Sequence, residues 1–575
     1  MEIADRLDRL AQQELDEVQQ FISTQTPMNC AVLLIEACRC LDHAHVRQLL
    51  SSRTDGKLSV QDFDILVRGW NVLFALLIPR VGIVSGIPLN ASVPTIREAV
   101  MGMMHFSGRY VVLSRTAEMV RHGMVSAKAQ GSTIELELSD RALSDHFHDQ
   151  VDYGKLAELN AKIWAEFNPA ADADSALHLR KVIGELTFPW ETSQGTMVGY
   201  TADPEIDAYF LRAVTQNALK WRDDAGIHPD AKFDGCSGET LTAVVLVLMS
   251  FYTKHIMFVE EAIKLHPDVN QHMSLTIWKT RAELIDSLVI ATAAPEQEVI
   301  AALKMVTVTA SDADYFMTEH APGIPLVIEL STDYLLTPVS GIFRNSFNGV
   351  RMLRETASPV IQNAFREHRE EWMAADLYAL FQGPRFQCIP GQTKLRRKRQ
   401  TVTDIDAAVF DNATSDLMLF QLKWQDFTSS KVRTQRSKAK NFTEQVRLWA
   451  AATGHWIDDF GTLELCRALK VKLPSGTRPR TVRLIAIGRS NARFRSYGYD
   501  AGTDVLALPW PQFVRLRYEI GPQRDFFELL TQAVIEEASE PIPRQPIPYL
   551  LERHGLRINF KDIWSGFDED RANLS

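Results

Sequence analysis

Three polar residues in the range 403–424 have the types and the spacing that metal-dependent hydrolysis of a phosphodiester would need. They are Asp406, Gln421 and Lys423, in a stretch that reads TDIDAAVFDNATSDLMLFQLKW. The turn formers at positions 411–416 divide this stretch into two short strands, which predicts a hairpin. Closing that hairpin would bring Asp406 beside Gln421 and Lys423 at the strand ends.

The alternation of side chains along each strand predicts which of them share a face of the sheet. In the first strand, Asp404 and Asp406 are expected on one face, opposite Ile405, Ala407 and Val409. The second strand divides in the same way, with one face formed by Leu417, Leu419, Gln421 and Lys423 and the other by Met418, Phe420, Leu422 and Trp424. A strand this apolar on both faces is expected to be buried, where acids and a lysine need a partner.

A bound Mg²⁺, or Mn²⁺ in its place, would be such a partner. Mg²⁺ prefers oxygen ligands in near-octahedral geometry, and we expect the carboxylate of Asp406 and the amide oxygen of Gln421 to supply two of them. Lys423 would then lie beside the attacking water or the phosphate, where its charge stabilises the negative charge that develops. The alternative interpretation is a solvated sheet face, because acids and lysines at alternating positions are common on exposed strands.

This arrangement resembles the PD-(D/E)xK, or restriction-endonuclease-like, superfamily, which includes Holliday-junction resolvases and Mrr-type and RecB-type nucleases. Asp406 matches the aspartate of the family motif, and Lys423 matches its lysine. Gln421 stands where the family usually has glutamate, and a neutral amide binds a cation less strongly than a carboxylate does. The resemblance covers the chain from Pro359 to Tyr518 and implies a helix, three strands, a helix and a further strand as the core of a nuclease domain.

The resemblance also implies a glutamate that faces the metal from the helix before the first strand. Residues 358–381 have the apolar periodicity of a helix and are rich in Glu, Ala and Leu. Glu370 and Glu371 both fit the spacing of the family's glutamate. Both therefore stay candidates for a further ligand or a catalytic base.

Two groups of basic residues flank the proposed site and predict contacts with a phosphate backbone. One group precedes the TDID strand and the other follows the QLK strand, and together they comprise Arg396, Arg397, Lys398, Arg399, Lys431, Arg433, Arg436 and Lys438. A helix expected from Phe442 to Ala451 contains Gln445 and Trp449, which resemble the Gln-x-x-x-Tyr element of RecB-type nucleases and add Gln445 to these contacts. We expect nucleic acid as the partner, DNA in preference to RNA. Solvated loops are the alternative interpretation of either basic group.

The composition is that of a globular protein with several cores. The chain has 575 residues, of which 46% are hydrophobic, and a single domain of that length would be unusual. A net charge of −10 argues against a protein coated in nucleic acid. Six cysteines without a disulfide framework indicate a reducing cytoplasm. Cys38 and Cys40, with His43 and His45 nearby, lack the spacing of a zinc finger and are expected to be buried thiols.

Residue patterns divide this α+β protein into four segments. Residues 1–200 are expected to form a helical domain with a small β element, and residues 201–357 a second helical domain or a continuation of the first. Residues 358–520 form the predicted α/β restriction-endonuclease-like domain, with a central mixed sheet flanked by helices. Residues 521–575 are interpreted as a helix, a Pro-rich connector and a frayed tail.

Local patterns add four expectations. Residues 189–199 predict a loop, and residues 273–294 predict one continuous helix. The start of the chain, MEIADRLDRLAQQELDEVQQF, is a charged amphipathic helix and not a secretory signal. Because apolar runs such as Leu241–Tyr252 are too short to span a bilayer, we expect core helices and no membrane.

These patterns favour a cytoplasmic, Mg²⁺-dependent nucleic-acid endonuclease with a helical region that recognises the substrate or regulates the site. The alternative is a nuclease fold that has lost turnover, or has little of it, and acts as a nucleic-acid-binding or interaction module; Gln421 is the best argument for it. A second copy of the chain or a partner protein could bind through the helical region. Many stand-alone members of the superfamily protect bacteria from foreign DNA, which makes defence one use of such an enzyme.

Overall fold

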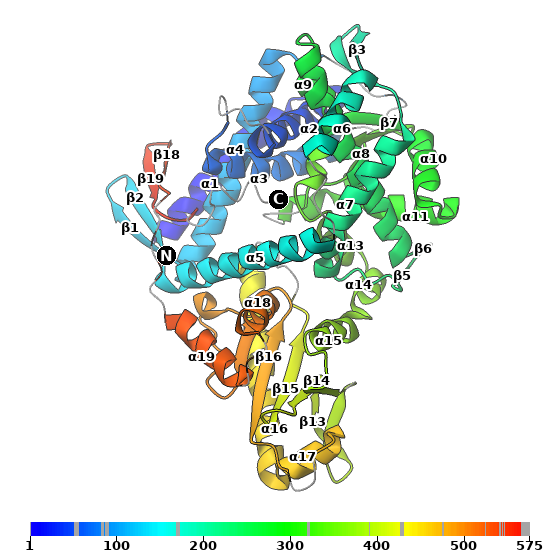
Figure 1. Cartoon of the computed structure of the whole chain (residues 1–575). Helices are drawn as coiled ribbons and strands as arrows, with labels where there is room; N and C mark the ends of the chain where they lie inside the picture. Colours follow the sequence, from blue (N-terminus) through cyan, green and yellow to red (C-terminus); the bar gives the residue numbers. More distant parts are fainter. Residues whose placement is uncertain are drawn as a thin grey trace.

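The computed structural model places a helical N-terminal region beside a part built around a mixed sheet. It describes residues 2–50, 57–81, 86, 91–167, 173–318, 323–389, 391–425, 431–473, 477–521, 523, 525–539, 542, 544 and 547–564. Helix α5 (Asp140–Phe167) crosses between the broad helical part and the narrower part that holds the sheet (Figure 1). The α+β class, the helical N-terminal region and the central mixed sheet flanked by helices are therefore confirmed.

Four long helices form the first core. α1 (Glu2–Ser23) and α3 (Val60–Leu77) pack against α4 (Pro94–Arg121), and α2 (Pro27–Leu49) packs against α3 and α4. The crossing of α3 and α4 is close, because a Cβ atom on Gly69 would lie 1.7 Å from a backbone oxygen of α4. Only glycine fits at this crossing, so the close packing of α3 and α4 requires glycine at position 69.

A second core surrounds α8 (Gly238–Leu265). Its buried residues lie on most sides of the helix, and α7 (Pro204–Ala225), α10 (Arg281–Thr292) and α11 (Glu296–Val306) pack against it. Among the described residues, α8 is the one helix long and apolar enough to cross a membrane, and 72% of its most apolar stretch is buried inside the protein. Its apolar side chains therefore have protein partners.

His255 is a buried histidine of α8 that is held in its neutral form. Tyr200 Oη donates to His255 Nδ1 over 3.0 Å, and His255 Nε2 donates to the carbonyl oxygen of Ser274 over 2.7 Å. Burial lowers the pKa of His255 from 6.5 to about 4, since a charged ring in this core would lose its hydration. Protonation of this ring is therefore coupled to unfolding.

Two four-stranded sheets complete the helical part. The first has the order β7 (Ile277–Thr280), β10 (Tyr334–Thr337), β9 (Val327–Glu329), β8 (Thr307–Val308). The second has the order β1 (Val125–Gln130), β2 (Thr133–Leu138), β19 (Leu556–Phe560), β18 (Tyr549–Arg553). Because β19 pairs in parallel with β2, the end of the described chain is tied to its first third.

The sheet that holds the predicted site has five strands, with two parallel pairs and two antiparallel pairs. Its order is β11 (Phe386–Ile389), β14 (Ala407–Asp411), β15 (Asp416–Lys423), β16 (Thr481–Gly488), β17 (Leu506–Pro509). The hairpin from β14 to β15 is the predicted one, and the parallel pairing of β15 with β16 requires the crossover helix between them. β15 is thus central, with a strand on each side.

Helices cover both faces of this sheet. One face packs against α15 (Arg369–Ala379), α18 (Trp510–Ile520) and α19 (Phe526–Ser539), and the other against α16 (Val432–Phe460) and α17 (Thr462–Leu469). The predicted division of β15 is confirmed, since Leu417 and Leu419 pack toward α16 whereas Met418, Phe420 and Leu422 pack toward α18. The remaining elements are α6 (Ala173–Leu186), α12 (Ala313–Thr318), α13 (Ser346–Ala357), α14 (Pro359–Arg366), β5 (Lys232–Phe233), β6 (Cys236–Ser237), β12 (Thr393–Arg397) and β13 (Gln400–Ile405).

Two local predictions were wrong in the helical part. The range 189–199 is not a loop, because β3 (Thr187–Thr192) and β4 (Gly195–Tyr200) form a hairpin in which Pro189 is tolerated on a strand with a single neighbour. The range 273–294 is not one helix. It contains α9 (Gln271–Ser274), then β7, and α10 starts anew at a capping box on Thr280.

The C-terminal segment was also mispredicted in part. Residues 549–560 form a hairpin in the sheet with β1 and β2, because alternate side chains such as Ile558 and Phe560 complete an apolar core there. The helix predicted over 358–381 is two helices, α14 and α15. Half of the predicted Pro-rich connector, namely residues 541, 543, 545 and 546, and residues 565–575 of the predicted tail lie outside the described residues.

Candidate functional site

Asp406 lies at a bend between two strands. β13 ends at Ile405 and β14 begins at Ala407, while the backbone N–H of Asp406 donates to the carbonyl oxygen of Phe420 over 3.2 Å. The bend corrects the predicted alternation, because Ile405 packs toward α16 whereas Ala407 and Val409 pack toward α18. Asp406 therefore lies at the bend between β13 and β14, at the end of the five-stranded sheet.

The structure brings Asp406 and Gln421 into direct contact. Both side chains are buried, and Gln421 Nε2 donates to Asp406 Oδ2. The backbone N–H of Leu422 donates to the same oxygen over 2.8 Å. The register explains the contact: Ala407 pairs with Phe420, so the residue before Ala407 lies opposite the residue after Phe420.

Lys423 is the last residue of β15 and is half-buried. Its carbonyl oxygen accepts the backbone N–H of Arg489 over 2.9 Å, which fixes the strand end against the residue that follows β16. The ammonium acts on Asp406 electrostatically and lowers the pKa of that carboxyl group. The amine at 423 and the carboxylate at 406 therefore share one electrostatic environment.

The pKa of Asp406 is raised from 3.8 to about 6. Burial is the largest cause, because it removes the carboxylate from water, and the negative charges of Asp404 and Glu370 add to it. The hydrogen bond from Leu422 and the charge of Lys423 act in the opposite direction without cancelling the rise. The site is thus short of positive charge, which is the condition in which a cation would stabilise the ionised form.

The structure distinguishes the two helix glutamates. Glu370 acts on Asp406 and accepts a hydrogen bond from Gln392 Nε2 over 3.0 Å. Glu371 instead acts on His228, in the helical part of the protein. Both side chains are exposed, and Glu370 is the one on the side of Asp406.

Trp449 fixes the strand that leads to Asp406. Its indole Nε1 donates to the carbonyl oxygen of Asp404 over 2.8 Å, and the ring is buried against the sheet. Gln445, one turn earlier on α16, is exposed and has the position of a surface contact. Trp449 therefore packs against the sheet, whereas the side chain of Gln445 faces solvent.

The first basic group lies at the tip of a two-stranded ribbon. Arg396 and Arg397 end β12, and Lys398 and Arg399 form the turn to β13; all four are exposed. Arg397 lies 3.6 Å from Asp459, an exposed ion pair that solvent screens strongly. These cations are therefore available to a phosphate backbone.

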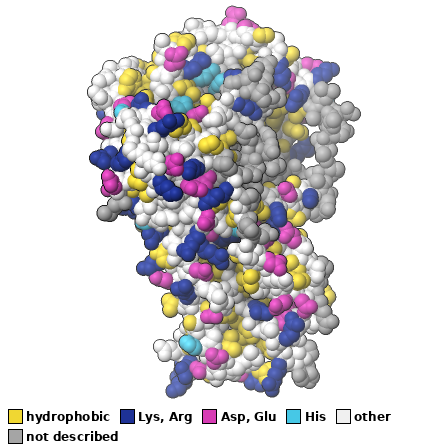
Figure 2. All heavy atoms as spheres, turned by 90° about the vertical axis from the view of Figure 1, so that its left-hand side faces the viewer, with side chains coloured by type: hydrophobic (Ala, Val, Ile, Leu, Met, Phe, Trp, Pro, Cys, Tyr) yellow, Lys and Arg dark blue, Asp and Glu magenta, His cyan; other side chains and the backbone are white. Residues whose placement is uncertain are grey.

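The second basic group occupies the start of α16, where a separate segment before the helix was expected. Arg433 lies 3.4 Å from Glu118, and Arg436 Nη1 lies 2.6 Å from His122 Nδ1, so both contact the helical part. Lys431 is the N-cap residue of α16 and Lys438 lies on its second turn, both half-buried. On the face shown in Figure 2, basic and acidic side chains are interspersed.

Some of the side chains at this site are suitable ligands for a hard cation such as Mg²⁺. Asp406 offers a buried carboxylate whose negative charge is poorly compensated. Gln421 directs its amide nitrogen to Asp406, and a half-turn of that amide would exchange nitrogen for oxygen. With Glu370 nearby, the arrangement could hold a cation beside an amine, which suits the binding and activation of a phosphate ester.

Sequence reasoning missed the residues that hold the end of β15. Two guanidinium groups lie over the Trp424 ring, with Arg369 Cζ 5.5 Å and Arg489 Cζ 5.1 Å from the ring centroid. Gln392, which binds Glu370, was missed as well. These residues come from separate elements and have no common spacing in the sequence, so no sequence signal joins them.

A cavity of about 620 Å³ lies elsewhere, between α5, α16, α19 and strands β16 and β17. Asp406, Gln421 and Lys423 do not line it. Its lining has the mixed apolar and paired charged residues of an interface between elements. Asp406 and its neighbours are therefore the stronger candidate for a functional site.

Comparisons of the chain with protein-family models, with curated proteins and with solved structures find no match.

Proposed function

We propose that the protein is a Mg²⁺-dependent nucleic-acid endonuclease of the PD-(D/E)xK type. The observation that carries the proposal is the convergence of Asp406, Gln421 and Lys423 at adjoining strand ends, with direct contact between the first two. The order of helix, three antiparallel strands, crossover helix and parallel strand around them is the order that the resemblance implies.

Each residue has a role that follows from its chemistry. Asp406 and Gln421 would hold the cation, with Glu370 as a further ligand or base, and Lys423 would position the attacking water and stabilise the developing charge. Bound Mg²⁺ would supply Lewis acidity toward the phosphate. The exposed cations at 396–399 would bind the nucleic-acid backbone.

A second candidate function is nucleic-acid binding without turnover. The orientation of Gln421 favours it, because the amide nitrogen donates to Asp406 and the neutral side chain adds no negative charge for a cation. In this alternative the basic ribbon still binds phosphates, and binding has a steep salt dependence with no Mg²⁺-dependent product.

The test is a cleavage assay with labelled single- and double-stranded DNA and RNA in Mg²⁺, Mn²⁺ or EDTA. Lys423→Met and Asp406→Asn should abolish cleavage, whereas Lys472→Met, which changes an exposed lysine near the far end of the sheet, should leave it unchanged. Binding of the same substrates is measured in parallel. Cleavage that persists in both site variants would refute the enzymatic proposal, and binding without any cleavage by the wild-type protein would select the second function.

A further inference from the structure

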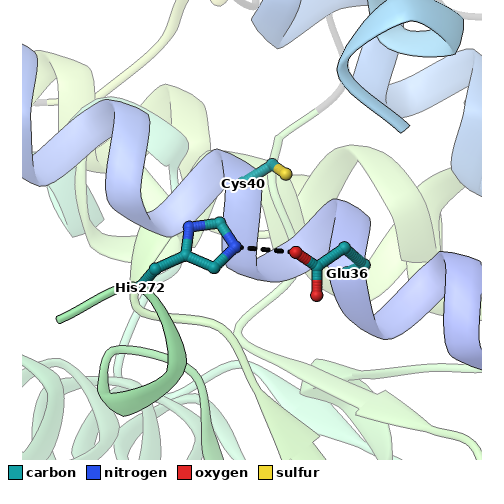
Figure 3. Close-up of side chains that lie close together, drawn as sticks. All are labelled: Glu36, Cys40 and His272. Atoms are coloured by element: carbon teal, nitrogen blue, oxygen red, sulfur yellow. Dashed lines mark hydrogen bonds and ion pairs between the residues drawn. The ribbon is translucent and has the colours of Figure 1, made fainter. Parts of the chain in front are cut away.

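A cluster of three side chains of the kinds that bind metal ions lies in the helical part, outside the proposed nuclease site (Figure 3). Glu36 and Cys40 are one turn apart on α2, so their side chains leave the same face of that helix. His272 approaches them from α9, 236 residues from Glu36 in sequence. One potential ligand atom from each residue lies within 4.8 Å of the others.

The three side chains are withdrawn from solvent. Their exposed fractions are 2% for Glu36, 3% for Cys40 and 6% for His272. Among the described residues the carboxylate and the imidazole bind each other, with His272 Nε2 2.8 Å from Glu36 Oε1. The described residues provide no hydrogen-bond partner for the Cys40 thiol, which is thus the unused donor of the group.

The neighbours of Glu36 keep the carboxylate ionised. Burial would raise its pKa, but hydrogen bonds from His272 and from Ser92, whose Oγ lies 2.5 Å away, lower it overall. Arg39 Nη1 lies 3.3 Å from one carboxylate oxygen and Arg97 Nε 3.8 Å from the other. Arg97 is 39% exposed, and its Nη2 donates to Ser92 Oγ over 3.0 Å.

Burial shifts the pKa of His272 and the pKa of Cys40 in opposite directions. Burial lowers the pKa of His272, so its ring is neutral and keeps a lone pair for coordination. Burial raises the pKa of the Cys40 thiol, and the charge of Glu36 raises it further. In the absence of a metal, the thiol therefore keeps its proton.

We propose that Glu36, Cys40 and His272 form a Zn²⁺ site. Sulfur, nitrogen and carboxylate oxygen are the donors that zinc accepts in tetrahedral sites, and the thiolate favours zinc over Mg²⁺. On binding, the S–H bond of Cys40 is replaced by a sulfur–zinc bond and the proton leaves to the solvent; the proton on His272 Nε2 moves to Nδ1. Water fills the fourth position.

Such a site would join two parts of the helical region. α2 belongs to the first core, whereas Val269 and Leu275, which flank α9, belong to the second. The metal would therefore act as a cross-link between segments that otherwise meet through side-chain packing and hydrogen bonds such as the one between His272 and Glu36. Zinc binding would raise the free energy of unfolding of the whole helical part, because the unfolded chain does not hold the three ligands together.

The experiment measures zinc in the full-length protein, purified under reducing conditions, stripped with a chelator and then reloaded. The wild-type protein should bind one Zn²⁺ per chain, and Co²⁺ in its place should give thiolate-to-metal charge-transfer absorption. Cys40→Ser and His272→Gln should lose the metal, and Cys40→Ser the absorption. Cys38→Ser, which changes a thiol equally buried on the same helix, should keep both.

Two further measurements make the outcome decisive. Asp406→Asn should retain the zinc, which separates this site from the proposed nuclease centre. The melting temperature of the wild-type protein should rise on reloading, while that of His272→Gln should not change. Failure of the reloaded wild-type protein to bind zinc, or retention of zinc by both Cys40→Ser and His272→Gln, would overturn the proposal and leave a hydrogen bond between a neutral imidazole and a carboxylate.

Discussion

Replacing Gln421 with glutamate tests whether the site is built for a cation. In the wild-type protein the amide nitrogen of Gln421 donates to Asp406 Oδ2 in a buried environment. Gln421→Glu removes that donor and places a second carboxylate against Asp406. A hydrogen bond to a charged group contributes about 1.5–3 kcal/mol. We therefore expect the variant to be destabilised by at least that amount without divalent ions at about pH 8, which is well above the ordinary pKa values of carboxyl groups.

Mg²⁺ should reverse this loss. A ligand present at about 100 times its Kd stabilises the folded state by about 2.7 kcal/mol, and two carboxylates bind the ion more strongly than a carboxylate and an amide do. The assay is chemical unfolding of both proteins with and without Mg²⁺. The expected result is a Mg²⁺-dependent gain in the free energy of unfolding that is larger for Gln421→Glu than for the wild-type protein.

Gln512→Glu is the matched control. Gln512 is also buried, and its Nε2 donates to a carboxylate oxygen of Glu537 over 2.8 Å, away from the proposed metal site. This variant should lose stability without recovering it in Mg²⁺. If Gln421→Glu and Gln512→Glu respond equally to Mg²⁺, the reasoning that Asp406 and residue 421 form a cation site is refuted.

Three further predictions concern the surface, the packing and the pH dependence of the protein. Replacing the four cations at 396–399 with glutamine should weaken nucleic-acid binding, and the slope of log Kobs against log salt concentration should fall by about 0.9 for each lost phosphate contact; an unchanged slope would exclude the ribbon as a binding surface. Gly69→Ala should destabilise the protein by about 1–3 kcal/mol or more, because its Cβ would lie 1.7 Å from the backbone of α4. Gly102→Ala, where the new Cβ meets no atom within 4 Å, should stabilise it by about 0.5–1 kcal/mol; equal effects in thermal unfolding would contradict the packing. The pKa of buried His255 is lowered from 6.5 to about 4, so the unfolded chain binds more protons in this range and stability should fall by about 3 kcal/mol as the pH drops from 6.5 to 4. His255→Gln should reduce that loss in denaturant titrations across the range, and an unaltered loss would show that another group is responsible.

The contact between Asp406 and Gln421 could be predicted from one continuous stretch because hairpin pairing is local. The turn at 411–416 and the alternation of β15 fix the register within about twenty residues, so Asp406 and Gln421 had to meet if the hairpin closed. The choice between Glu370 and Glu371 could not be made in this way. It depends on how α15 is rotated over the sheet, which helical periodicity alone does not set for two adjacent residues.

The same limit applies to the segments that were mispredicted. Residues 557–560 pair with a strand more than four hundred residues earlier, and β7 interrupts a helical pattern because it pairs with β10. Pairing of this kind depends on long-range contacts, which override local propensity. The bend at Asp406 likewise follows from β13 leaving the main sheet to pair with β12.

By itself, the sequence determined the helical character of the first half, the hairpin of the second, and the residue types that could bind a phosphate and its cation. Local hydrogen bonds and side-chain alternation carry that information, because they join residues that are neighbours along the chain. Only the tertiary structure decided that Glu370 acts on Asp406, that two arginines lie over the Trp424 ring, and that His272 reaches Glu36 and Cys40. Those contacts join elements far apart in sequence, and their geometry comes from the packing of whole helices and sheets, which no local pattern specifies.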